Sequence, residues 1–92
     1  MTFILNKCYG GWSISKEVKE MLNLDTVYPT MSKKLETDLV ALINEYGSEF
    51  CSGKHAKLKV VEIPDDCTDY EINDYDGIET ITYVVDGKIY HA

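Results

Sequence analysis

Residues 84–91, VVDGKIYH, decide the fold class. Asp86 and Gly87 lie between apolar β-forming residues, and an Asp-Gly pair in that setting is typical of a two-residue type I′ turn. Residues 78–85, IETITYVV, form the strand that enters this turn, and residues 88–91 form the strand that leaves it. The sequence therefore predicts an antiparallel hairpin at this end of the chain.

Further strands are predicted upstream of the hairpin. Residues 2–6, TFILN, form a short strand, and residues 57–63, KLKVVEI, form another that Pro64 ends. YEI at 70–72 is a third, and we expect NDYDG at 73–77 to form the turn before residue 78.

Two helices are predicted between the first two strands. Ser13 or Ser15 can cap the first, because a serine oxygen accepts a hydrogen bond from a free N–H of the first helical turn. Its apolar face consists of Val18, Met21 and Leu22. The second covers residues 35–46, LETDLVALINEY, and Gly47 ends it. Its apolar face consists of Leu35, Leu39, Leu42, Ile43 and Tyr46, with Val40 at the flank.

This order of elements predicts one α+β domain over residues 1–92. We expect two helices packed on one face of a small, mostly antiparallel β-sheet, as a two-layer sandwich. No apolar run is long enough to span a membrane, and the first residues lack a basic leader, so the expected location is the cytoplasm. The three cysteines are widely spaced and odd in number, which favours reduced thiols.

The charge composition argues against direct nucleic-acid binding. The 92 residues carry 16 acids and nine bases, a net charge of −7. All nine bases are lysine, whereas phosphate recognition relies heavily on the planar arginine fork. A negative chain also repels a polyanion.

Residues 8–15, CYGGWSIS, allow two interpretations. Glycines and serines before a helix can hold an anion on free N–H groups, with aromatic rings beside them to stack a base. That pocket would use Lys7, Tyr9, Gly10, Gly11, Trp12, Ser13 and Ser15. The same residues can instead form a tight turn, with a glycine at positive φ, a serine cap and Trp12 in the core. The stretch lacks the Gly-Lys-Ser/Thr ending of a P-loop.

Residues 62–79 contain eight acids and no base: Glu62, Asp65, Asp66, Asp69, Glu71, Asp74, Asp76 and Glu79. They resemble a calcium loop around Gly77, but the first and twelfth ligand positions would be Ile72 and Tyr83, which excludes an EF-hand. The alternatives are a weaker cation site, a solvated sheet edge, or an acidic face that imitates DNA phosphates and docks on the basic groove of a nucleic-acid enzyme. The partner surface would consist of Asp65, Asp66, Asp69, Tyr70, Asp74, Tyr75 and Asp76, because tyrosine suits protein interfaces.

Catalytic and metal-binding patterns are weak. Cys51 and His55 could supply zinc ligands or a nucleophile pair, with Cys8, Cys67 or His91 completing a metal site. No closely spaced cysteine or histidine pair supports a zinc site, and no serine triad, P-loop or redox CxxC occurs. We therefore expect a binding protein without a cofactor or metal.

The chain resembles a family of small, uncharacterised proteins of phages and prophages. The resemblance rests on CYGGWSIS at 8–15, AKLKVVEIPDD at 56–66 and YEINDYDGIETI at 70–81. Family members share a YGGF/W-S-x-S turn, an LKIVEIPDD segment and a YDG-I-E turn, and many end in a basic, aromatic tail. Here the tail, VVDGKIYHA, contains no arginine. The resemblance implies an accessory protein acting in a bacterial host cytoplasm.

Three hypotheses follow. The first is an inhibitor that sequesters a host protein, such as a defence effector, through the acidic, tyrosine-rich surface. The second is a sponge for a small anionic nucleotide-type signal, bound at the glycine turn and at the interface of a homo-oligomer. The third is a thiol enzyme or hydrolase that uses Cys51 and His55.

Overall fold

A computed structural model describes all residues, 1–92, and its centre is a two-stranded ribbon. β1 (Thr2–Asn6) pairs antiparallel with β2 (Leu58–Glu62), and Ile4 lies opposite Val60. Both predicted strands are confirmed. Pro64 follows β2 closely, as expected of a residue that cannot donate to the ladder.

The remaining strands form a separate antiparallel sheet. β3 (Asp69–Tyr75), β4 (Ile78–Val85) and β5 (Lys88–His91) lie in that order. Asp86 and Gly87 have φ values of 50° and 76°, the positive values that a type I′ turn needs. The predicted five-residue turn at 73–77 is wrong. Asp76 and Gly77 alone form it, with φ of 52° and 91°, because they too adopt positive φ and so let β3 pair up to Tyr75.

Three helices lie between β1 and β2 in the chain. α1 (Lys16–Met21) begins after Ser15, whose Oγ accepts from the Val18 N–H at 3.1 Å, so the predicted serine cap is confirmed. α2 (Lys33–Tyr46) has Ser32 as its cap, and Gly47 ends it with φ of 91°. α3 (Ser48–Cys51) is a single turn that the sequence did not indicate.

The apolar faces of the helices are narrower than predicted. Leu35 and Leu39 are buried in α2, whereas Tyr46, in the last turn, is 47% exposed. Met21 was expected to be buried but is 48% exposed. It is the last residue of α1, and only the face of that helix that carries Val18 is buried in the core. The exposed Tyr46 ring stacks on Phe50 of α3 at 5.0 Å between centroids.

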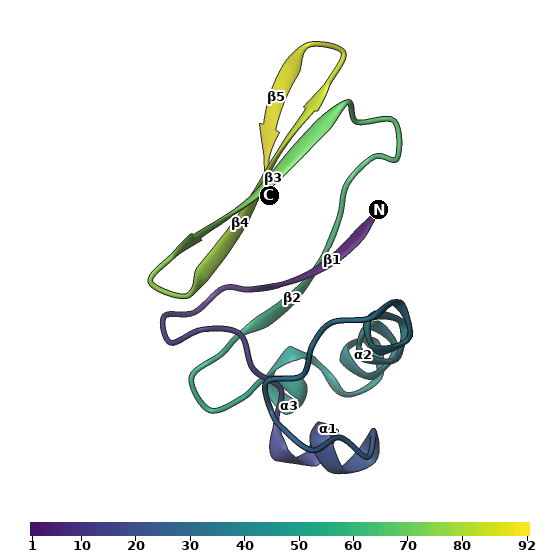
Figure 1. The fold of residues 1–92 in the computed structure, drawn as a ribbon, viewed down its shortest axis with the longest axis vertical. Helices are drawn as coiled ribbons and strands as arrows, with labels where there is room; N and C mark the ends of the chain where they lie inside the picture. Colours follow the sequence, from purple (N-terminus) through teal and green to yellow (C-terminus); the bar gives the residue numbers. More distant parts are fainter.

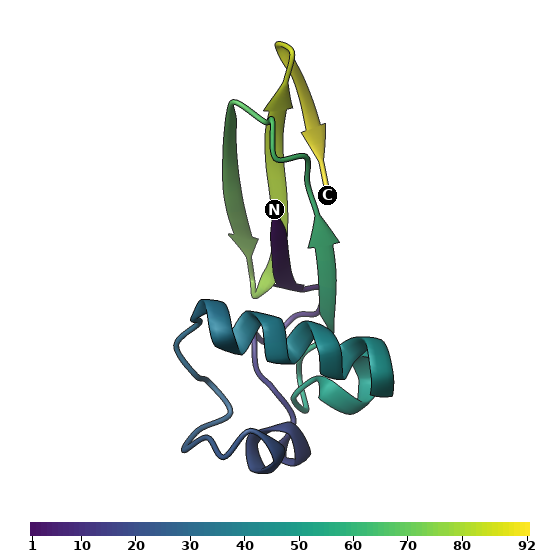
Figure 2. The same ribbon diagram turned by 90° about the vertical axis from the view of Figure 1, so that its right-hand side faces the viewer.

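The ribbon lies between the helices and the three-stranded sheet (Figures 1 and 2), and a separate core lies on each side of it. Ile4 and Leu58 face the helices and pack with Val18, Leu39 and Cys51, among others. Leu5, Val61 and Ile63 face the other way and pack against Ile81 of β4. Adjacent residues of a strand point to opposite faces, which is why Ile4 and Leu5 enter different cores.

The α+β class and the antiparallel pairing are therefore confirmed, with the helices on one face of the ribbon. The three-stranded sheet covers the other face and extends beyond it, which gives an elongated molecule of 43 × 26 × 21 Å (Figure 1). None of the helices has the length and apolar character that crossing a bilayer requires.

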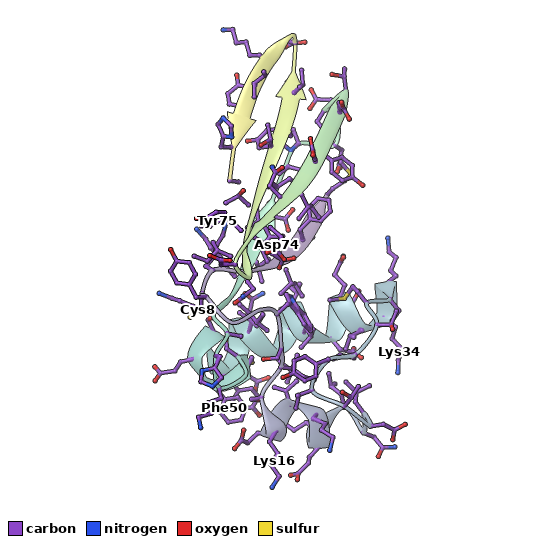
Figure 3. All side chains as sticks on the ribbon, turned by 60° about the vertical axis from the view of Figure 1, so that its left-hand side comes forward. Cys8, Lys16, Lys34, Phe50, Asp74 and Tyr75 are labelled. Atoms are coloured by element: carbon purple, nitrogen blue, oxygen red, sulfur yellow. The ribbon has the colours of Figure 1, made fainter.

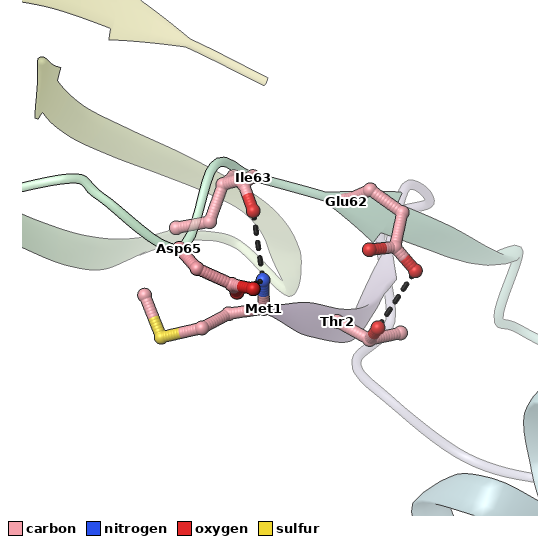
Figure 4. A network of polar contacts seen from close by, with 5 residues as sticks. All are labelled: Met1, Thr2, Glu62, Ile63 and Asp65. Carbon is pink, nitrogen blue, oxygen red and sulfur yellow. Dashed lines mark hydrogen bonds and ion pairs between the residues drawn. The ribbon is translucent and has the colours of Figure 1, made fainter.

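A polar contact ties the start of β1 to the loop after β2 (Figure 4). The Met1 amino group donates to the Ile63 carbonyl at 2.7 Å and to the Asp65 carboxylate at 2.5 Å. That hydrogen bond and the amine's positive charge hold the pKa of Asp65 below its usual value. Thr2 donates to Glu62 in the same network.

Candidate functional site

The glycine turn at 10–11 is packed against two other segments. Gly10 and Gly11 have φ values of 116° and 94°, so positive φ explains both glycines, as the turn interpretation predicts. A Cβ placed on Gly77 would lie 2.3 Å from the Gly11 nitrogen, and one on Gly10 would lie 2.7 Å from the Cβ of His55. The turn between β3 and β4 therefore packs directly on the glycine pair.

Asn6 links these segments from within. The residue is fully buried, and its side-chain amide donates to the carbonyls of Cys8 at 2.7 Å and Gly77 at 2.5 Å. Its Oδ1 accepts from the Lys57 N–H at 2.8 Å. Every polar atom of the side chain has a partner, as a buried amide requires. Sequence reasoning missed this residue, because an asparagine that ends an apolar strand gives no signal of burial.

Lys7 points toward the three-stranded sheet. Its ammonium group donates to the carbonyls of Glu79 at 2.7 Å and Ala92 at 3.3 Å. Burial lowers the pKa of Lys7, Lys59 adds to that lowering, and the negative charge of Glu79 opposes it. Lys7 thus joins β1 to the second sheet rather than offering its charge to a ligand.

The seven residues predicted to bind an anion are not gathered at one place. Gly10, Ser13 and Ser15 line a polar hollow of about 440 Å³ together with Lys54 and His55. Trp12 lies in a different groove, where its indole N–H donates to the Ile4 carbonyl at 3.0 Å. It packs against the helical core as the turn interpretation predicts.

Three of the backbone N–H groups of residues 8–15 are paired within the chain, and the other five have no partner in it. Gly10 donates to the Asp76 carbonyl at 3.3 Å, Ile14 to Val27 at 2.9 Å, and Ser15 to Cys51 at 2.9 Å. The hydroxyl of Ser15 is occupied by the α1 cap. An anion at this turn would have to compete with these bonds.

The acidic segment, in contrast, is open to solvent. All seven residues of β3 are exposed, and Tyr75 at its end is 73% exposed. Figure 3 shows Asp74 and Tyr75 at the end of the sheet beside the loop of Cys8, with Lys16, Lys34 and Phe50 in the helical part. Because β3 is an outer strand, one of its edges has no neighbour.

Some of the predicted partner-binding residues also have local structural roles. Asp65 pairs with the Met1 amine in the only ion pair of the chain. Asp69 accepts from the Tyr70 N–H at 2.9 Å, and Asp74 accepts from the Gly77 N–H at 2.9 Å, both within turns or strand ends. The Tyr70 ring packs on Phe3 at 5.3 Å between centroids. Asp66, Tyr75 and the carboxylate of Asp76 make no such contacts.

Charge is divided unevenly between the two parts of the molecule. Residues 62–92 contain nine of the 16 acids and one of the nine lysines, a net charge of −8. Residues 1–61 contain the other seven acids and eight lysines, a net charge of +1. Residues 62–92, which contain the three-stranded sheet, therefore hold the whole negative excess of the protein.

The structure brings together no group of three or more histidine, cysteine, aspartate or glutamate side chains that could hold a metal ion. Cys51 is fully buried in the helical core, and burial raises the pKa of its thiol. His55 is exposed and lies against Gly10. A nucleophilic cysteine needs the opposite environment, with access and a lowered pKa.

Comparison of the chain with protein-family models, with curated proteins and with solved structures finds no match. The interpretation of the site therefore rests on the residues and their geometry.

Proposed function

We propose that the protein is a non-catalytic binding protein that sequesters a basic partner protein through its acidic sheet surface. We define this surface as β3 with the preceding acidic loop, residues 65–76. The observation that carries the proposal is that every residue of β3 is exposed, within residues 62–92, whose net charge is −8.

Electrostatics supports a basic partner. Of the eight acids in residues 62–79, only Asp65 forms an ion pair, so most of this charge is left without a countercharge. Such a surface accelerates association with an oppositely charged partner and rejects a like-charged one. Exposed Tyr70 and Tyr75 add rigid aromatic area of the kind that interfaces favour.

The resemblance to small phage and prophage proteins supports the setting. In that setting the partner is a host protein in the bacterial cytoplasm, such as a defence effector, and binding inhibits it. The sponge hypothesis receives less support, since the turn's glycines are packed and Trp12 faces another groove.

Charge reversal at Asp66 and Glu71 tests the proposal. Neither side chain makes a hydrogen bond or ion pair, so Asp66→Lys/Glu71→Lys leaves the fold intact. Tagged protein is recovered gently from bacterial lysate, with and without phage infection, and examined by native mass spectrometry. We expect the wild type to retain a basic protein and the double variant to bind it about tenfold more weakly or not at all.

Glu20→Lys/Glu45→Lys is the matched control, because it makes the same change in net charge on exposed positions of α1 and α2. This control should bind as the wild type does. Equal retention of the partner by both double variants would refute the acidic surface. Retention of a small molecule in place of a protein would favour the sponge.

A further inference from the structure

The acidic surface borders an apolar groove of about 260 Å³. β1 forms its floor, with Trp12 beside it. Pro29 and Met31 of the loop before α2 form one wall, and Ile72 of β3 forms the other. Met31 and Ile72 are 42% and 43% exposed, so apolar area on both walls is in contact with water. A groove of this size is smaller than a typical small-molecule site and suits one large side chain.

The lining carries negative charge and no positive charge. Glu36 of α2 and Glu79 of β4 both line the groove, and Asp74 lies directly opposite Glu79 in the β3–β4 register. Directly opposed residues of an antiparallel pair project from the same face. A positively charged group beside the groove would therefore meet carboxylates from two layers of the molecule.

Two backbone groups on the edge of β1 that β2 leaves free already have side-chain partners. Ile4 accepts from the Trp12 indole at 3.0 Å, and the Asn6 N–H donates to the Glu79 carboxylate at 2.8 Å. These side chains occupy the edge of β1 that β2 leaves free. An added strand would have to displace both side chains from that edge, which favours insertion of a side chain over strand addition.

We infer that this groove is the anchor site for a bulky apolar side chain of the partner that has lysine or arginine next to it. The inference rests on the proposed function and specifies the partner's chemistry. Charge alone gives speed and selectivity of association, whereas affinity comes mainly from a few anchors in desolvated pockets. The groove provides such a pocket at the border of the acidic surface.

Three short peptides separate the two contributions. The probes are acetyl-Lys-Phe-Lys-amide, acetyl-Lys-Ala-Lys-amide and acetyl-Glu-Phe-Glu-amide, and the readouts are amide NMR shifts and the emission of Trp12, the only tryptophan. We expect Lys-Phe-Lys to bind with an affinity on the order of millimolar and to shift β1, Ile72 and the Trp12 indole. Lys-Ala-Lys should shift the acidic surface without shifting β1 or the Trp12 indole, and Glu-Phe-Glu should shift neither the acidic surface nor the groove.

Ile72→Ser should weaken Lys-Phe-Lys about three- to tenfold, because it removes one wall of the groove from an exposed position. Ile89→Ser is the matched control, since Ile89 is 65% exposed on the same sheet but away from the groove, and it should change nothing. If Lys-Phe-Lys shifts the groove no more than Lys-Ala-Lys, or Ile72→Ser has no effect, the anchor site is wrong while the acidic surface stands. If the groove responds and β3 does not respond to Lys-Ala-Lys, the acidic surface fails instead.

Discussion

At the scale of single residues, the molecule depends on contacts between short segments far apart in the sequence. Asn6, Gly10 and Gly77 come from the first strand, the loop after it and the turn near residue 77, and they meet at one junction. The YGGW segment at 9–12 and the YDGIE segment at 75–79 pack on each other here. Positive φ at a glycine was predictable from the sequence. Which distant segment packs on that glycine was not, because local sequence patterns contain no information about long-range contacts.

Gly77 and Gly87 offer a matched test of this junction. Both follow an aspartate in a two-residue turn, and both have positive φ, but a Cβ on Gly87 would meet nothing within 4 Å. Gly87→Ala should lower the free energy of unfolding by about 1 kcal/mol through backbone strain alone. Gly77→Ala adds the clash with Gly11 and should cost about 3 kcal/mol or more.

Urea unfolding of both variants measures the difference. An equal loss of stability in the two would mean that the β3–β4 turn does not pack on the glycine pair.

At the scale of elements, the strands followed their local patterns closely. TFILN and IETITYVV form strands with the predicted bounds, because short apolar and β-branched runs bounded by turn residues have few alternatives. β3 was predicted too short. Its Asn73 and Asp74 are residues typical of turns, yet cross-strand pairing with Thr80 and Glu79 keeps them extended.

The division of the strands into two sheets could not be predicted from local sequence patterns. Whether β1 pairs with β2 alone or also with β4 depends on side chains such as Trp12 and Glu79, which occupy the free edge of β1. Likewise, the sequence indicated an acidic, tyrosine-rich surface, and the structure adds that β3 is exposed along its whole length. The groove beside it needs residues from five separate segments and left no sequence signal.

Cys51 tests how α3 packs into the helical core. Since burial raises its pKa above the ordinary 9.0, the unfolded chain releases this proton at a lower pH than the folded protein does. As the pH rises through the pKa of the unfolded thiol, the unfolded state is increasingly favoured and the free energy of unfolding falls. Cys51→Ala should lose this part of the alkaline decline, as urea midpoints between about pH 7 and pH 10 would record.

Alkylation of the native protein provides the complementary observation. Cys8 and Cys67 are half-buried and should react, whereas Cys51 should resist until the protein unfolds. If Cys51 reacted as fast as Cys8 does, the thiol of Cys51 would not be buried, and the hypothesis of a thiol enzyme would have to be considered again.

At the scale of the whole molecule, charge and architecture divide along the same line. Residues 1–61, which form the helical layer and most of the ribbon, are nearly neutral at +1, and residues 62–92, which contain the three-stranded sheet, hold −8. The sheet extends beyond the ribbon, away from the helices, so a partner can reach it without contacting the helical layer (Figure 2). A stable base that presents an exposed, charged strand is the arrangement expected of a binding protein.

The most direct test of this account is hydrogen exchange of the protein alone and in complex with its captured partner. We expect slower exchange in the complex at β3 and around Trp12, with α1 and α2 unchanged. Protection confined to the helices or to residues 10–16, with β3 exchanging as in the free protein, would contradict the account.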